Sequence, residues 1–171
     1  MKLLYMTVKS VSGVWTPSRS TARSHSGLWG RVFHLPSFKS MRNATVLVVK
    51  IRGVATETIK NIVLSGIGKL IVLDDEIVRP EDLGAGFFYR SEDVNVKKRV
   101  HAAKPHIESL NPLVAVEVLD DASILYNDEQ LESLLSTVNL VCVTDSSKDL
   151  AVGISHAPIA QTGIHRHIYI A

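Results

Sequence analysis

Residues 46–57, Val-Leu-Val-Val-Lys-Ile-Arg-Gly-Val-Ala-Thr-Glu, decide the fold of this 171-residue chain. A short aliphatic run passes through a turn at Gly53 into a stretch with helical character. This order is typical of a buried strand that leads into a phosphate-binding turn and then into a helix, whose first N–H groups can approach an anion. Only one glycine remains in the turn, and Lys50 and Ala55 stand where a glycine-rich loop has no side chain. The stretch therefore has the outline of a nucleotide site with a compromised phosphate loop.

The rest of the chain repeats the alternation of apolar runs and helical stretches. The runs are nearly continuous in Val, Ile and Leu, which is typical of parallel strands covered on both faces. They lie at 45–49, 69–74, 114–119, 139–143 and 166–170, and the helical stretches between them lie at 56–65, 93–110, 128–136 and, more weakly, 146–161. Pro105 lies inside the second helical stretch and predicts a kink or a late helix start. We therefore predict an α/β fold with a Rossmann-like, doubly wound, mainly parallel sheet of about five strands.

The chain divides at residue 40 into two parts of different composition. Residues 1–40 carry six Lys/Arg, eight Ser and no Asp or Glu, whereas residues 41–171 carry thirteen Lys/Arg and seventeen acids. The first part has the composition of a mitochondrial transit peptide, and the alternative is a disordered basic arm. We predict a basic, Ser-rich, disordered arm at 1–40 and a Rossmann-like domain at 41–171.

Several classes of protein and site are disfavoured. The chain has no run of eighteen apolar residues, so we expect no membrane partner. Its single cysteine, Cys142, lies in an apolar run and is interpreted as a small core residue. His165 and His167 share a strand face without a neighbouring carboxylate, so we expect no metal site there. No nucleophile with an adjacent base is recognisable, so we predict no catalytic residue.

The candidate ligand-binding residues follow the predicted strands, because open parallel sheets bind ligands beyond the carboxyl ends of their strands. Gly53 follows the first strand, residues 74–76 (Asp-Asp-Glu) follow the second, and Asp145 follows the fourth. The acidic cluster lies at the distance from Gly53 at which a carboxylate reaches a ribose hydroxyl. This spacing leaves a nicotinamide-dependent oxidoreductase open as an alternative. The basic run 97–99 (Lys-Lys-Arg) is interpreted as a solvated helix face, and we expect no nucleic-acid partner.

The order of short phrases resembles the adenylating domain of the activating enzymes for ubiquitin-like proteins. The phrases are IVLSGIGKL at 62–70, LDDEIV at 73–78, EDLGAGFF at 81–88, SEDV at 91–94, LNP at 110–112 and VCVTD at 141–145. Within that superfamily, which includes ThiF and MoeB, the resemblance is greatest to the small, non-catalytic subunits of SUMO-activating enzymes. The family continues through further strands after the point where this chain ends, so we expect an apparently truncated, amino-terminal part of the domain with an exposed sheet edge.

The resemblance assigns roles to individual positions. It implies Gly53 and Ala55 in the phosphate loop, Glu76 as the ribose carboxylate, Asp82 where an asparagine is usual, Ala85 where an arginine is usual, Lys98 as the lysine of the next helix, and Asp145 as the aspartate that helps to hold Mg-ATP. Without an arginine at position 85, the charge that develops on the transferred phosphates lacks a donor. The expected nucleotide site, made of Gly53, Glu76, Lys98 and Asp145, is therefore degenerate.

The function that this resemblance implies is that of a regulatory subunit. The chain would bind no cofactor itself and would pair with the catalytic subunit of a SUMO-activating enzyme, which binds ATP and Mg, adenylates SUMO and captures it as a thioester. Apolar residues within 84–88 would form part of the subunit interface. Ubiquitin or NEDD8 activation is the alternative within the family. The resemblance implies the nucleus, and a transit peptide at 1–40 would instead direct the chain to mitochondria.

Overall fold

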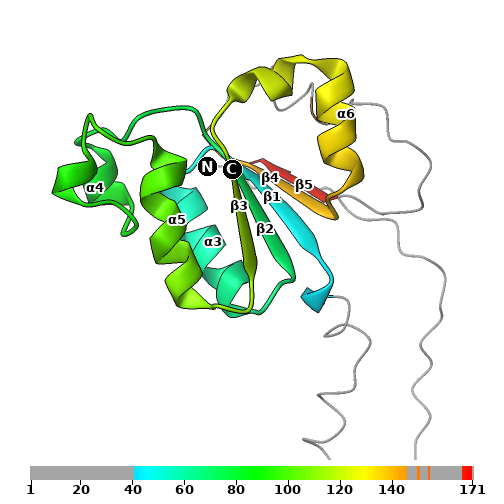
Figure 1. The fold of residues 1–171 in the computed structure, drawn as a ribbon, viewed down its shortest axis with the longest axis horizontal. Helices are drawn as coiled ribbons and strands as arrows, with labels where there is room; N and C mark the ends of the chain where they lie inside the picture. The colour runs from blue at the N-terminus through cyan, green and yellow to red at the C-terminus, as the bar shows by residue number, and fades with distance from the viewer. Residues whose placement is uncertain (1–40, 146–149, 151–153, 155–166, 171) are drawn as a thin grey trace, which may run out of the picture. The chain divides into compact units, whose positions relative to one another are not determined.

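A computed structural model of the chain describes residues 41–145, 150, 154 and 167–170. The predicted arm at 1–40 and most of the fourth helical stretch lie outside the described residues. The strands are β1 (Thr45–Val49), β2 (Lys69–Leu73), β3 (Ala115–Leu119), β4 (Leu140–Val143) and β5 (His167–Ile170). They form one sheet in the order β3-β2-β1-β4-β5, and every neighbouring pair is parallel. The predicted α/β class and the five-stranded parallel sheet are confirmed (Figure 1).

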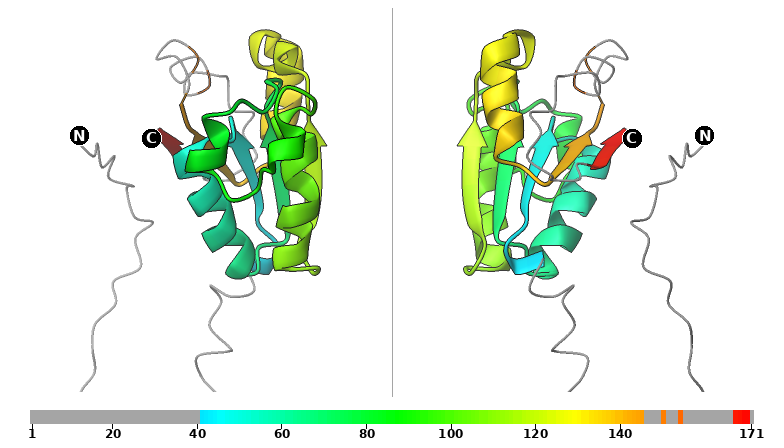
Figure 2. Two further views of the ribbon diagram at one scale, coloured as in Figure 1. Left: turned by 90° about the vertical axis from the view of Figure 1, so that its left-hand side faces the viewer. Right: turned by 90° about the vertical axis from the view of Figure 1, so that its right-hand side faces the viewer.

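The sheet carries helices on both faces (Figures 1 and 2). Successive residues of a strand point to opposite faces. Val46 and Val48 of β1 therefore pack in the cluster that includes α3 (Gly53–Leu64) and α5 (Arg99–Leu110). Leu47 and Val49 pack in the second cluster with α6 (Asp128–Ser136). Because both faces of β1 are buried, its aliphatic run is continuous instead of alternating with polar residues.

The first crossover helix, α3, begins three residues earlier than predicted, at Gly53 instead of Thr56. The turn after β1 is therefore shorter than expected, which brings the helix amino end close to the strand end. The helix ends at Leu64, and Gly66 has a φ of +79°, a conformation that glycine adopts without steric cost. The predicted bounds of α6 are confirmed, and the Asn127 side chain accepts a hydrogen bond from the Gln130 N–H at its start.

The connection from β2 to β3 contains more structure than the single predicted helix. It includes α4 (Asp82–Ala85) and a 3-10 turn, η1 (Ser91–Asp93). The helix predicted from residue 93 begins only at Arg99, six residues later than predicted, and Pro105 lies inside it. A further 3-10 turn, η2 (Ala122–Tyr126), precedes α6.

Cys142 is confirmed as a core residue, because it is buried in β4 and burial raises the pKa of its thiol. Within the described part of the chain, no helix is long and apolar enough to cross a membrane.

Candidate functional site

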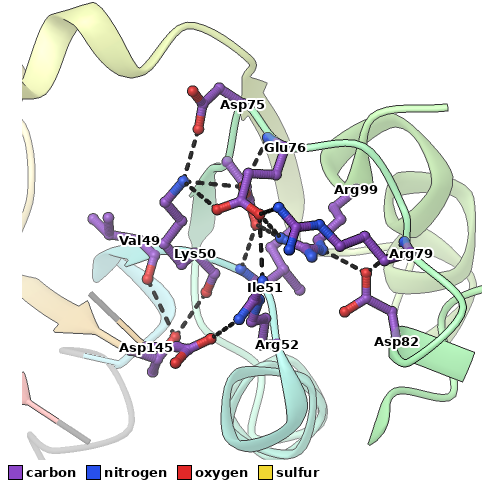
Figure 3. A network of polar contacts seen from close by, with 12 residues as sticks. Val49, Lys50, Ile51, Arg52, Asp75, Glu76, Arg79, Asp82, Arg99 and Asp145 are labelled. Atoms are coloured by element: carbon purple, nitrogen blue, oxygen red, sulfur yellow. Dashed lines mark hydrogen bonds and ion pairs between the residues drawn. The ribbon is translucent and has the colours of Figure 1, made fainter. Parts of the chain in front are cut away.

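The carboxyl ends of β1, β2 and β4 meet at one edge of the sheet and place three charged turns side by side (Figure 3). Residues 50–53 follow β1, residues 74–76 follow β2, and residues 144–145 follow β4. The strand pairing explains the convergence, since parallel neighbours in register end at the same level. This edge is the place where an α/β sheet binds its ligands.

Asp74 is completely buried and organises the turn after β1. Its Oδ2 atom accepts a hydrogen bond from the Ile51 N–H at 2.9 Å, and its Oδ1 atom accepts one from the Glu76 N–H at 3.0 Å. A buried carboxylate is costly unless it is hydrogen-bonded and paired with a cation. Asp74 therefore holds two loops together and is not free to take up a ligand.

The Lys50 backbone adopts an uncommon conformation with φ of +66°. Its N–H donates to the Leu73 carbonyl at 2.8 Å, and its own carbonyl accepts a hydrogen bond from the Thr144 Oγ1 hydroxyl, also at 2.8 Å. These two bonds tie the turn to the ends of β2 and β4, which keeps the left-handed conformation in place.

The Lys50 side chain turns onto the acidic loop after β2. Its Nζ atom lies 2.7 Å from Asp75 Oδ1, 3.2 Å from Glu76 Oε1 and 3.5 Å from Asp74 Oδ1. Burial lowers the pKa of the Lys50 ammonium group, but the hydrogen bond to Asp75 and the charges of Asp74 and Glu76 outweigh burial, so the pKa is raised. The ammonium group stays charged and neutralises this loop.

Arg52 links the other two strand ends. Its Nη1 atom donates to Asp145 Oδ2 at 2.6 Å, and its Nη2 atom lies 3.4 Å from Glu76 Oε2. The hydrogen bond to Asp145 raises the pKa of the guanidinium group. The structure thus brings Glu76 and Asp145, two of the predicted site residues, to the same place, and Arg52 lies between them (Figure 3).

Arg99 corrects the interpretation of the basic run 97–99 as a solvated face. Its side chain is completely buried. The Nε atom donates to Asp82 Oδ2 at 2.7 Å, and the Nη1 atom lies 3.0 Å from Glu76 Oε2 and 3.6 Å from Asp74 Oδ2. Its Nη2 atom is buried and has no hydrogen-bond partner within the described residues. Burial of Arg99 among carboxylates was not visible in the sequence, because those partners lie 17 to 25 positions away along the chain.

Of the remaining predicted site residues, Gly53 directly follows Arg52 and Lys98 lies apart from the charged cluster. Gly53 is the first residue of α3, and a Cβ atom placed there would meet the Ala85 Cβ at 3.5 Å. Lys98 points to the end of β3, where its Nζ atom contacts Asp120 Oδ2 at 3.1 Å. His101 Nε2 lies at the same distance from that oxygen. The structure therefore does not bring Lys98 into contact with the other predicted site residues.

Tyr89 is a site residue that the sequence interpretation missed. It is buried, and its hydroxyl donates to the Ile51 carbonyl at 2.7 Å, which fastens the loop after α4 to the turn after β1. Burial raises the pKa of the Tyr89 hydroxyl, so the group remains a donor. Thr56 and Tyr89 both crowd Gly86, where an added Cβ would lie 3.0 Å from the tyrosine ring. The predicted interface loop is therefore packed directly on the turn after β1 and the first turn of α3.

No group of three or more metal-ligating side chains occurs among the described residues. His165 and the side chain of His167 lie outside the described residues.

Acidification is expected to weaken the cluster through Glu76. Burial raises the pKa of this carboxyl, but Lys50 and Arg99 outweigh it and the pKa is lowered from 4.5. A lowered folded-state pKa stabilises the fold above the unfolded-state value, and this contribution is lost as the pH falls through the folded-state value. Denaturant midpoints measured from pH 7 to acid pH should fall less steeply in Glu76→Gln than in the wild type. Glu108→Gln, at an exposed position with only a 3.8 Å contact to Lys104, should follow the wild type.

Comparison with known proteins gives one family. The model of the ThiF family matches residues 27–150. SUMO-activating enzyme subunit 1 from Rattus norvegicus is 37% identical over 127 residues, which are 74% of this chain and 34% of the relative. The DNA damage tolerance protein RHC31 of Saccharomyces cerevisiae is also 37% identical, over 75% of this chain and 34% of the relative. The chain thus spans about a third of the length of the curated relatives it matches.

Solved structures show the same fold. The E. coli tRNA N6-threonylcarbamoyladenosine dehydratase TcdA, in complex with AMP, has a TM-score of 0.65 at 21% identity, with 87% of this chain and 62% of that chain covered. E. coli MccB with ATP has a TM-score of 0.60 at 17% identity, with 68% of this chain and 34% of that chain covered. At these identities the likeness concerns the fold alone.

Proposed function

Because the chain belongs to the ThiF family, we propose that it acts as a non-catalytic subunit of a heterodimeric SUMO-activating enzyme. The observation that carries this proposal is the pairing of Glu76 and Asp145 with Arg52, a cation of the chain itself. Arg52 contacts one oxygen of each carboxylate, so a ribose or a magnesium ion would have to compete with it. The chain would leave ATP and magnesium to the catalytic partner subunit, which would adenylate SUMO and capture it as a thioester.

The alanine at position 85 also supports a non-catalytic role for this chain. An adenylating site needs cationic donors aimed at the phosphates where charge develops. Ala85 offers only a methyl group, which would lie close to any side chain added at Gly53. Arg99, the buried arginine near this loop, is engaged with Asp82 and Glu76. This chain would therefore form part of the subunit interface and supply no catalytic residue to the complex.

The loop after β2 is the surface that we propose for pairing with the catalytic subunit. Leu83 and Phe87 are 38% and 41% exposed, whereas Phe88 is completely buried and anchors the loop in the core. Lys60 of α3 lies 5.4 Å from the centre of the Phe87 ring. Exposed apolar side chains on a loop held by a buried anchor are typical of a rigid interface.

By likeness to SUMO-activating subunits, the complex would function in the nucleus.

The proposal is tested by co-expression of the 171-residue chain with the catalytic subunit of a SUMO-activating enzyme. We expect a co-purifying complex that performs ATP–pyrophosphate exchange in the presence of SUMO, and little nucleotide binding by the chain alone. Phe87→Asp should reduce co-purification, because it places a charge in the interface. The control Tyr126→Asp changes an aromatic residue that is 75% exposed in η2, and pairing should be retained.

Failure of the wild-type chain to co-purify, or a complex without exchange activity, would contradict the proposed function. Neither result would change the family of the chain, which is carried by residues 27–150. Replacement of SUMO by ubiquitin or NEDD8 in the exchange assay separates the proposed modifier from its alternatives within the family.

A further inference from the structure

A closed ring of buried contacts joins the two ends of the loop proposed for pairing. Residues 82–89, the pairing loop, carry the exposed side chains of Leu83 and Phe87. The contact ring runs through Asp82, Arg99, Asp74, Ile51 and Tyr89, and none of these residues is more than 4% exposed. The first and last residues of the pairing loop are thus both members of the ring.

Each link of the contact ring is polar and directional. At one end of the loop, Asp82 Oδ2 accepts a hydrogen bond from Arg99 Nε at 2.7 Å, and Arg99 Nη1 lies 3.6 Å from Asp74 Oδ2. The same Asp74 oxygen accepts a hydrogen bond from the Ile51 N–H at 2.9 Å. The Ile51 carbonyl accepts one from the Tyr89 hydroxyl at 2.7 Å, which closes the ring at the other end of the loop. The ring therefore ties the pairing loop to the start of α5, the end of β2 and the turn after β1.

The middle of the pairing loop has few polar ties of its own. The N–H groups of Leu83, Gly84 and Gly86 donate to carbonyls only three or four residues earlier. Among the described residues, no hydrogen bond or ion pair joins residues 83–87 to another helix or strand. Phe88 is completely buried, but apolar burial is non-directional and does not set the orientation of the loop. The two ends of the loop therefore determine how Leu83 and Phe87 are presented.

We propose that the contact ring positions the pairing loop before a partner binds, with Tyr89 as the positioning residue at the carboxyl end of the loop. The proposal rests on the proposed function for the identity of the partner, whereas the ordering of the loop is a property of the isolated chain. A surface that is ordered in advance loses less conformational entropy on association. The ring therefore raises the affinity for the partner although its own side chains are buried.

The variant Tyr89→Phe opens the contact ring by removing a single hydroxyl group. It keeps the aromatic side chain, which packs so closely that a Cβ added at Gly86 would lie 3.0 Å from it. In the isolated 171-residue chain, the Gly86 amide should exchange its hydrogen at least about fivefold faster than in the wild type, the ratio that corresponds to one typical hydrogen bond. The Leu131 amide of α6, which donates to the Asn127 carbonyl, should exchange at the wild-type rate.

The same variant should also weaken pairing. Its dissociation constant for the catalytic subunit of a SUMO-activating enzyme, measured by calorimetric titration, should be about fivefold higher than that of the wild type. Tyr126→Phe is the matched control, because it removes the same hydroxyl group from a tyrosine that is 75% exposed in η2. It should leave both the Gly86 exchange rate and the affinity unchanged.

Equal Gly86 exchange in Tyr89→Phe and the wild type would overturn the proposal, whatever the partner does. Faster exchange with unchanged affinity would also overturn it, because the order of the loop would then have no effect on pairing. If the wild type does not bind the catalytic subunit, the proposed function fails, and Gly86 exchange alone decides whether the ring orders the loop. If Tyr89→Phe does not fold, Asp82→Asn weakens the ring at its other end with nearly the same side-chain shape, and the same two measurements decide.

Discussion

Replacing Arg99 by methionine is expected to lower the free energy of unfolding by about 3 to 5 kcal/mol, because it leaves the buried Asp82 without its cation and the buried Asp74 with only the Lys50 ammonium group. The side chains of Arg99 and Asp74 are completely buried, and that of Asp82 is 5% exposed. Methionine fills much of the same volume, so loss of charge pairing and not a cavity dominates the effect. Chemical denaturation of the 171-residue chain at neutral pH measures the change.

The control for this substitution lies on the same helix. Lys104→Met removes an exposed cation with a 3.8 Å contact to Glu108, and the expected change is within about 0.5 kcal/mol. Adding Asp82→Asn to Arg99→Met removes the unpaired carboxylate, so the double variant should be more stable than Arg99→Met alone. A loss in Arg99→Met no larger than that in Lys104→Met would mean that the cluster does not stabilise the fold.

Replacing Gly68 by alanine is expected to destabilise the chain by about 3 kcal/mol, at the upper end of the usual cost of overpacking. A Cβ atom at this position would lie 2.2 Å from the Arg42 carbonyl oxygen and 3.1 Å from its carbonyl carbon. These are backbone atoms at the entry to β1, so the chain itself must move. The Gly68 N–H donates to the Ala44 carbonyl at 3.1 Å, and the Gly68 carbonyl accepts from the Ala115 N–H at the same distance, so displacement also strains these bonds.

The comparison for this prediction is Gly84→Ala in α4, where no atom lies within 4 Å of the added methyl group. It should leave the thermal midpoint close to that of the wild type, because alanine favours helix and meets no neighbour. Equal midpoints for Gly68→Ala and Gly84→Ala would show that residues 42–44 move aside without cost.

The strands and the crossover helix at Asp128–Ser136 could be predicted because their signals are local. A continuous run of Val, Ile and Leu indicates a strand buried on both faces wherever it lies in the chain. Acids in the first turn and apolar spacing in the rest defined α6 in the same way. The start of α5 was placed too early at residue 93, because residues 94–98 form a turn and a short bridge to Ile77 that no periodic pattern marks.

The candidate site could be predicted only in part. The strand-end rule and the resemblance together selected Glu76 and Asp145, which the structure places on the same arginine. They did not predict that Arg52 would be this arginine, or that Lys50 would turn onto residues 74–76. The roles of Gly53, Glu76, Lys98 and Asp145 as remnants of a nucleotide site stay a prediction.

The two glycines of the phrase IVLSGIGKL illustrate what the sequence decided and what the tertiary structure decided. Gly66 ends α3 with a positive φ, which a helix followed by glycine already indicates. At residue 68 a glycine is required because the carbonyl of Arg42 lies where a side chain would be. Arg99 can be buried because it pairs with the carboxylates of Asp74 and Asp82. No local sequence pattern identifies these partners. The sequence alone determined the succession of the five strands and the main crossover helices along the chain, because periodicity and capping act within a few residues. Steric contact and charge pairing act through space, so only the folded chain decided which glycine is indispensable and which cations pair with the carboxylates at the strand ends.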